Sequence, residues 1–175
     1  MITLMLIASI VMVVGYIGGY VIKNKTLPSS ISAMVYDLEG GWRYLWQCWF
    51  GLVTIGVAPA LFEATKDSNF QFLAFLAIGC LMAVSAIPLV KKEKNKAHCV
   101  FAICGGVLTQ ICVAMICPWW LLIWLPMVLL VCCFYFGAFN VDNKFFSFIE
   151  GKGILLAELA CTISLVGSLV SFLIK

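Results

Sequence analysis

Six long apolar stretches, separated by short polar connections, occupy most of this 175-residue chain. They cover residues 2–22, 45–62, 70–90, 97–117, 119–139 and 154–174. A hydrocarbon core about 30 Å thick is crossed by about 20 residues of α-helix, so each stretch is about long enough to span it. With 64% hydrophobic and 11% charged residues, the composition is typical of a polytopic membrane protein and excludes a soluble globular domain.

The predicted fold is an all-α, polytopic integral membrane bundle of six transmembrane helices, formed as one domain by residues 1–175. Backbone polar groups in lipid must be paired within the protein, which leaves helices or a closed barrel. The stretches lack the alternation of barrel strands, so helices are predicted. Pro118 lies in the very short fourth connection, which requires an antiparallel hairpin there. The bulky fifth stretch is predicted to face lipid on the outside of the bundle.

Nine of the eleven Lys and Arg residues belong to three of the five connections. These nine are Lys23, Lys25, Arg43, Lys91, Lys92, Lys94, Lys96, Lys144 and Lys152. Lys66 and Lys175 lie on the other side. Basic loops are retained in the cytoplasm, so the asymmetry predicts three cytoplasmic loops and both termini outside. Anionic lipid accounts for the net charge of +3, and a nucleic-acid partner is not expected.

The first connection carries a helical pattern of its own. Apolar residues recur at i, i+3, i+4 and i+7, at Ile31, Met34, Val35 and Leu38. Serines precede this run and glycines 40 and 41 follow it, which are typical residues for the start and the stop of a helix. The pattern predicts a short amphipathic helix at the cytoplasmic interface, with its apolar side toward lipid or the bundle.

Tryptophans form two groups at predicted membrane boundaries. The first group is Trp42, Trp46 and Trp49, and the second is Trp119, Trp120 and Trp124. Indole rings favour the headgroup region, so both groups are predicted to form interfacial belts on opposite faces.

Small residues indicate where helices pack, because close backbone approach drives helix association in lipid. Gly15 and Gly19 form a GxxxG match, Gly79 belongs to a similar spacing in the third stretch, and Gly105 does so in the fourth. Packing within the chain and a homodimer fit the GxxxG match equally well. One-sided series of small or polar residues also follow the fourth and sixth stretches, at Ala102, Gly105, Thr109 and Cys112 and at Ala157, Cys161, Ser164, Ser168 and Ser171.

Glu158 is the one carboxylate well inside a predicted span, about one turn from its cytoplasmic end. An ionisable residue at this depth is costly and marks a candidate functional site. Pairing with Lys152 or Lys96 is the structural alternative, and His98 could equally face the headgroups. Gln110 could join helices or line a cavity. The complete set of candidates for a ligand cavity on the cytoplasmic side is Ser32, Tyr36, Asp37, His98, Gln110 and Glu158.

The segment from Leu27 to Tyr36 contains the run Pro-Ser-Ser-Ile-Ser-Ala. With the His98 region and the turn at Cys117 and Pro118, it resembles small six-helix membrane proteins of Bacteroides-type bacteria. The resemblance implies a bacterial inner-membrane location. Such proteins are distantly similar to alkaline ceramidases and progestin-receptor-like membrane hydrolases, which use a Ser, an Asp and three zinc-binding His. Ser32 and Asp37 match that pattern, but this chain contains one histidine.

Three classes of function follow from these features. The first is a non-enzymatic module that binds a lipid or amphiphile, or couples to a partner protein, through a polar cavity open to the cytoplasm. The second is a metal-dependent membrane hydrolase, and the third is a subunit of an oligomeric transporter or channel. The nine cysteines form no CxxC pair, so no metal site and no cofactor are expected. Membrane lipids are the expected partners, and a homo-oligomer or a membrane-protein partner is compatible with the sequence.

Overall fold

The computed structural model describes residues 1–39, 41–87, 96–135 and 152–175, and every regular element among them is helical. The prediction of an all-α fold is therefore confirmed for these residues. In chain order the elements are α1 (Ile2–Asn24), η1 (Ser32–Asp37), α2 (Trp42–Thr65), α3 (Gln71–Ala86), α4 (Lys96–Ile116), η2 (Pro118–Ile123), α5 (Trp124–Tyr135) and α7 (Gly153–Ile174).

Four of the described helices, α1, α2, α4 and α7, are long and apolar enough to cross a membrane. The helix α3 and the segment Pro118–Cys132 are also apolar but shorter. The predicted third and fifth stretches continue into residues 88–90 and 136–139, which lie outside the described residues. The structure thus shows four candidate membrane spans, and six spans stay a prediction.

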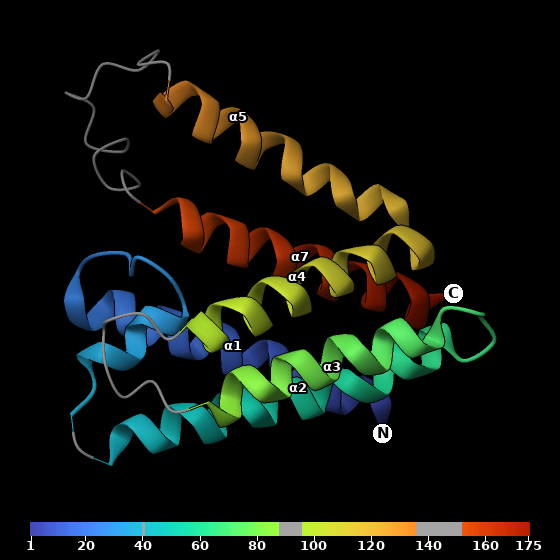
Figure 1. Ribbon diagram of the computed structural model, residues 1–175, viewed down its shortest axis with the longest axis horizontal. Helices are drawn as coiled ribbons and strands as arrows, with labels where there is room; N and C mark the ends of the chain where they lie inside the picture. The colour runs from blue at the N-terminus through green and yellow to red at the C-terminus, as the bar shows by residue number, and fades with distance from the viewer. Residues whose placement is uncertain (40, 88–95, 136–151) are drawn as a thin grey trace.

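Successive long helices run in alternating directions, so the connections gather at the two ends of the bundle (Figure 1). Both chain termini lie at one end, with the α2–α3 turn, and η1 lies at the other. We call the end that contains η1 the η1 end. Four basic residues, Lys91, Lys92, Lys94 and Lys144, lie outside the described residues, which leaves seven of the eleven. Five of these seven belong to the η1 end, namely Lys23, Lys25, Arg43, Lys96 and Lys152.

The core forms where α1, α2, α3, α4 and α7 meet. Its largest fully buried apolar side chains include Leu6 of α1, Leu61 of α2 and Leu169 of α7. The segment formed by η2 and α5 packs against α7, and large side chains such as Leu125 and Leu129 are exposed along it. This arrangement agrees with the prediction that the fifth stretch lies on the outside. The hairpin at Pro118 is also observed (Figure 1).

Of the four glycines predicted to pack against another helix, only Gly105 does so within the described residues. Gly105 packs against Cys80 and Leu81 of α3, as the small-residue spacing predicts. At Gly15, Gly19 and Gly79, however, no described atom lies within 4 Å of an added Cβ. These three do not join helices within the described residues, because their sides of α1 and α3 face outward. The tightest contacts instead involve Gly56, which meets Ser9 of α1, and Gly167, which meets the ring of Trp120.

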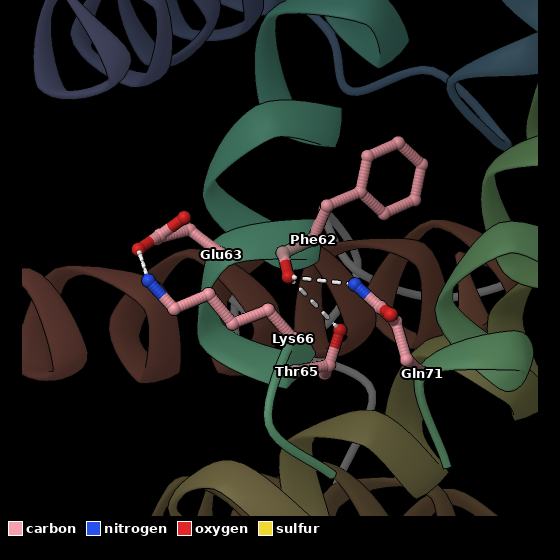
Figure 2. Close-up of polar contacts among 5 residues, drawn as sticks. All are labelled: Phe62, Glu63, Thr65, Lys66 and Gln71. Atoms are coloured by element: carbon pink, nitrogen blue, oxygen red, sulfur yellow. Dashed lines mark hydrogen bonds and ion pairs between the residues drawn. The ribbon is translucent and has the colours of Figure 1, made fainter. Parts of the chain in front are cut away.

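The turn between α2 and α3 is fastened by side chains from both helices (Figure 2). The carbonyl of Phe62 accepts hydrogen bonds from Thr65 Oγ1 and Gln71 Nε2, both at 3.4 Å. Lys66 pairs with Glu63, and this hydrogen bond raises the pKa of the Lys66 amine. Since both charges are exposed, the ion pair contributes little to stability. The turn is therefore a structural element, held mainly by its backbone and amide contacts.

The predicted amphipathic helix is shorter and more deeply packed than the sequence pattern suggests. It is the six-residue 3₁₀-helix η1, in which Met34 and Val35 are each 1% exposed. The hydroxyl of Ser30 accepts a hydrogen bond from the Ala33 amide at 2.9 Å, so a serine does stabilise its start. Gly40 lies outside the described residues, and Gly41 precedes α2. The apolar residues of η1 face the bundle, because the side chains of α2 cover them.

Candidate functional site

The connection between α1 and α2 folds back across the η1 end of the bundle, and we call its residues 26–38 the strap. A backbone hydrogen bond of 3.2 Å from the Leu155 amide to the Ser29 carbonyl ties the strap to the first turn of α7. Pro28, Ser30 and Ile31 are buried beside this contact. The strap thus packs as part of the bundle at this end, where most described basic residues also lie.

Glu158 fastens the strap to α7. Its carboxylate accepts a hydrogen bond from the backbone amide of Ile31, and the amide of Ser32 donates to it as well. These are the first amides of η1, which have no acceptor within that helix, and a negative charge is favourable at this position. Within the described residues the only ion pair is that of Glu63 with Lys66, so neither Lys96 nor Lys152 pairs with Glu158. Glu158 therefore acts as a cap for η1.

Ser32 lies beside Glu158, but its hydroxyl contacts a second serine. Its Oγ and that of Ser30 are 3.2 Å apart, and either can donate. Ser32 is half-buried, whereas Ser30 is 7% exposed. The two hydroxyls complete the polar start of η1.

Asp37 fastens the other end of η1 to α1. Tyr20 Oη donates a hydrogen bond of 2.5 Å to Asp37 Oδ2, in an exposed position. One turn earlier on α1, the ring of Tyr16 lies 4.4 Å from that of Trp49 of α2. Tyr36 is half-buried and packs on the same cluster of Val35 and Trp46. The strap is thus held by a carboxylate at each end of η1, one on the strap and one on α7.

Trp46 lies beneath the strap and is a residue that the sequence analysis assigned to an interfacial belt. It is 1% exposed, packs against Val35, and stacks on Phe50 with ring centroids 5.5 Å apart. The belt interpretation fits Trp42, which is 65% exposed, and is wrong for Trp46. Helical spacing alone does not distinguish the two, because four residues separate two positions on nearly the same side of a helix.

His98 is buried in the first turn of α4, where it interacts with the backbone of Val84 on α3. The prediction that it could face the headgroups is wrong, since its side chain is 5% exposed. This contact of His98 thus lies at the α3–α4 interface and not among the contacts that fasten the strap.

Gln110 joins three helices near the middle of the bundle. Its Oε1 accepts hydrogen bonds from Ser164 Oγ at 2.8 Å and Trp124 Nε1 at 2.9 Å. Its Nε2 donates to the Cys161 carbonyl at 3.3 Å. Of the two interpretations of Gln110, the structure supports the one in which it connects helices. A related bond, from Trp120 Nε1 to Ser171 Oγ at 2.9 Å, lies further along α7.

The six candidates therefore divide into three places. Ser32, Tyr36, Asp37 and Glu158 belong to the strap and its attachments, His98 belongs to the α3–α4 interface, and Gln110 belongs to the centre of the bundle. Tyr20 and Trp46 join the first group, although sequence reasoning did not select them as candidates. No group of three His, Cys, Asp or Glu residues that could hold a metal occurs in the part of the chain that the structure describes.

Comparison of the chain with protein-family models, with curated proteins and with solved structures gives no match. The resemblance to bacterial six-helix proteins and membrane hydrolases stays a prediction, and the function is argued from the geometry alone.

Proposed function

We propose that this chain is a non-enzymatic membrane module that binds a lipid or a similar amphiphile at the η1 end, beneath the strap. The observation that supports this proposal is the construction of the strap. Its apolar residues are buried on the bundle, yet side-chain hydrogen bonds of Glu158 and Asp37 fasten it. The proposal requires the strap to separate from the bundle by a local opening that leaves the transmembrane helices folded.

The charge distribution favours an amphiphile with an anionic headgroup. Five of the seven described basic residues belong to the η1 end, and four of them, Lys23, Lys25, Arg43 and Lys96, are exposed. By the positive-inside rule this end faces the cytoplasm of a bacterial inner membrane, where anionic headgroups attract Lys and Arg. Acyl chains would lie along the exposed apolar sides of the helices.

A hydrolase is a weaker interpretation of the same residues. Ser32 contacts Ser30, Asp37 contacts Tyr20, and His98 lies at the α3–α4 interface. The hydrolases that the sequence resembles hold zinc with three histidines, whereas the whole chain has one. Binding without catalysis therefore fits the described geometry better.

The test is the lipid that co-purifies with the protein in mild detergent, quantified by mass spectrometry per mole of protein. The wild type is expected to retain an anionic lipid in roughly stoichiometric amount. We expect Glu158→Gln to lower this retention severalfold, because a neutral acceptor makes weaker hydrogen bonds to the Ile31 and Ser32 amides and loosens the strap.

Glu63→Gln is the matched control, since it removes a carboxylate from the opposite end of the bundle. It should retain as much lipid as the wild type. Wild-type protein without specific lipid, or equal retention by both variants, would contradict the proposal.

A further inference from the structure

Among the described tryptophans that are not exposed, one indole N–H differs from the others. Trp49 Nε1 donates to the Met12 carbonyl, Trp120 Nε1 to Ser171 and Trp124 Nε1 to Gln110. Trp46 Nε1 is buried and has no hydrogen-bond partner among the described residues. Buried donors are normally paired, because desolvation without a new acceptor is unfavourable. This N–H therefore has an unused capacity to bind an acceptor.

The surroundings of Trp46 suit an amphiphile. Val35 of the strap covers it, while Phe50 and Trp49 lie beside it with ring centroids at 5.5 and 6.4 Å. Trp46 lies four residues after the start of α2, which corresponds to about 6 Å along the helix. Phospholipids carry ester carbonyls between their headgroups and acyl chains, and these are acceptors for an N–H near the end of a membrane-spanning helix.

We propose that the Trp46 indole N–H donates a hydrogen bond to an ester carbonyl of a phospholipid bound between the strap and α2. The strap covers this N–H in the structure, so the strap must separate from α2 before the lipid enters. The contacts of Glu158 and Asp37 then form again and hold the strap over the bound lipid. This inference rests on the proposed lipid-binding function and assigns the group that recognises the ligand.

Trp46→Phe tests the inference, because it removes the N–H and keeps an aromatic ring. Lipid retention by this variant should fall about fivefold to tenfold, the effect of losing one hydrogen bond in a binding site. Trp49→Phe is the matched control: it removes a similar volume from the same cluster, but its N–H already has a partner in the Met12 carbonyl. Because this N–H is not available to the lipid, Trp49→Phe should retain severalfold more lipid than Trp46→Phe.

The two proposals fail in distinguishable ways. Wild-type protein that retains no specific lipid contradicts the proposed function itself. If the wild type retains lipid and Trp46→Phe retains the same amount, only the role of Trp46 is overturned. An equal loss in Trp46→Phe and Trp49→Phe also overturns it, because the cluster would then act through packing alone.

A second measurement uses only the wild-type protein and therefore needs no variant. The ¹⁵N-indole resonance of Trp46 in delipidated wild-type protein is followed during titration with diacyl phospholipid or with its ether-linked analogue, which lacks ester carbonyls. A shift caused by the diacyl lipid alone supports the ester carbonyl as acceptor. A shift of equal size with both lipids shows that the ester carbonyl is not the acceptor and overturns this assignment, and no shift with either overturns the inference.

Discussion

Two polar regions of this bundle use the same kinds of side chain in different ways. Around Gln110, the side chain uses both of its polar atoms, and its three hydrogen bonds join α4, α5 and α7. At the η1 end, Glu158 accepts from two backbone amides of a short 3₁₀ segment, and Asp37 of that segment accepts from Tyr20. The nearby Trp46 N–H has no partner among the described residues. The first arrangement joins transmembrane helices to one another, whereas the second joins a connecting segment to the bundle, and the proposed function requires this segment to be released.

The difference shows that a polar residue in a membrane helix does not by itself indicate function. Gln110 and Glu158 both are unusual in an apolar sequence, but their partners differ. Gln110 binds groups on rigid helices, and Glu158 binds backbone amides of the strap. The proposed lipid site lies at the η1 end, where one buried donor, Trp46 Nε1, has no partner among the described residues.

Gln110→Leu should have the largest effect on stability, because it removes three hydrogen bonds. It also leaves Trp124 Nε1 without its acceptor, while Ser164 Oγ keeps its bond to the Cys161 carbonyl. At about 0.6–1.7 kcal/mol for each hydrogen bond within a membrane, we expect a loss of about 2–5 kcal/mol. The free energy of unfolding, measured by titration with a denaturing detergent, checks this value. Gln47→Leu is the control, since Gln47 makes one contact, to the Ile87 carbonyl, and should lose about 0.6–1.7 kcal/mol. Equal losses of stability in the two variants would show that the three hydrogen bonds of Gln110 contribute no more than the single bond of Gln47.

Gly167→Ala should have an intermediate effect on the same region. The added Cβ would lie 2.4–2.5 Å from three ring atoms of Trp120, so the ring must move and its bond to Ser171 is strained. Overpacking of this kind costs about 1–3 kcal/mol. Gly79→Ala, with no described atom within 4 Å, should be neutral or slightly stabilising by the same assay. A Gly167→Ala protein as stable as the wild type would refute the close packing of η2 on α7.

The sequence predicted the all-helical fold, and four of the six predicted spans are long enough to cross a membrane within the described residues. It also predicted the hairpin at Pro118 and the inward side of α4, where Thr109 and Cys112 are buried. It did not predict which glycines pack. Lipid and a neighbouring helix are both apolar, so small-residue spacing at Gly15 and Gly19 looks the same whichever of them it faces. Contacts such as Gly167 with Trp120 depend on a large side chain from a separate segment, which spacing within one helix does not reveal.

The candidate site was predictable only in part for a related reason. Glu158 was identified because a carboxylate is costly inside a span. Its partners were expected to be Lys152 or Lys96, because charged side chains are visible in a sequence. The actual partners are backbone amides, which every residue except proline carries and which therefore leave no sequence signal. Trp46 was missed because spacing does not separate a buried indole from an interfacial one.

Tyr20→Phe should have the smallest effect on global stability, and that is what makes it informative about the strap. It removes the hydrogen bond to Asp37, which lies in an exposed position, so the free energy of unfolding should change by less than about 0.5 kcal/mol. Local opening of the strap should nevertheless increase, and amide hydrogen exchange at residues 33–38 should accelerate about twofold to fivefold. Tyr44→Phe, at a 70% exposed position near the same end, is the control and should leave this exchange unchanged. If Tyr20→Phe instead lowers global stability as much as Gln110→Leu, the strap unfolds together with the core. The contrast between a fixed centre and a releasable cover would then be lost, and with it the physical basis for lipid entry beneath the strap.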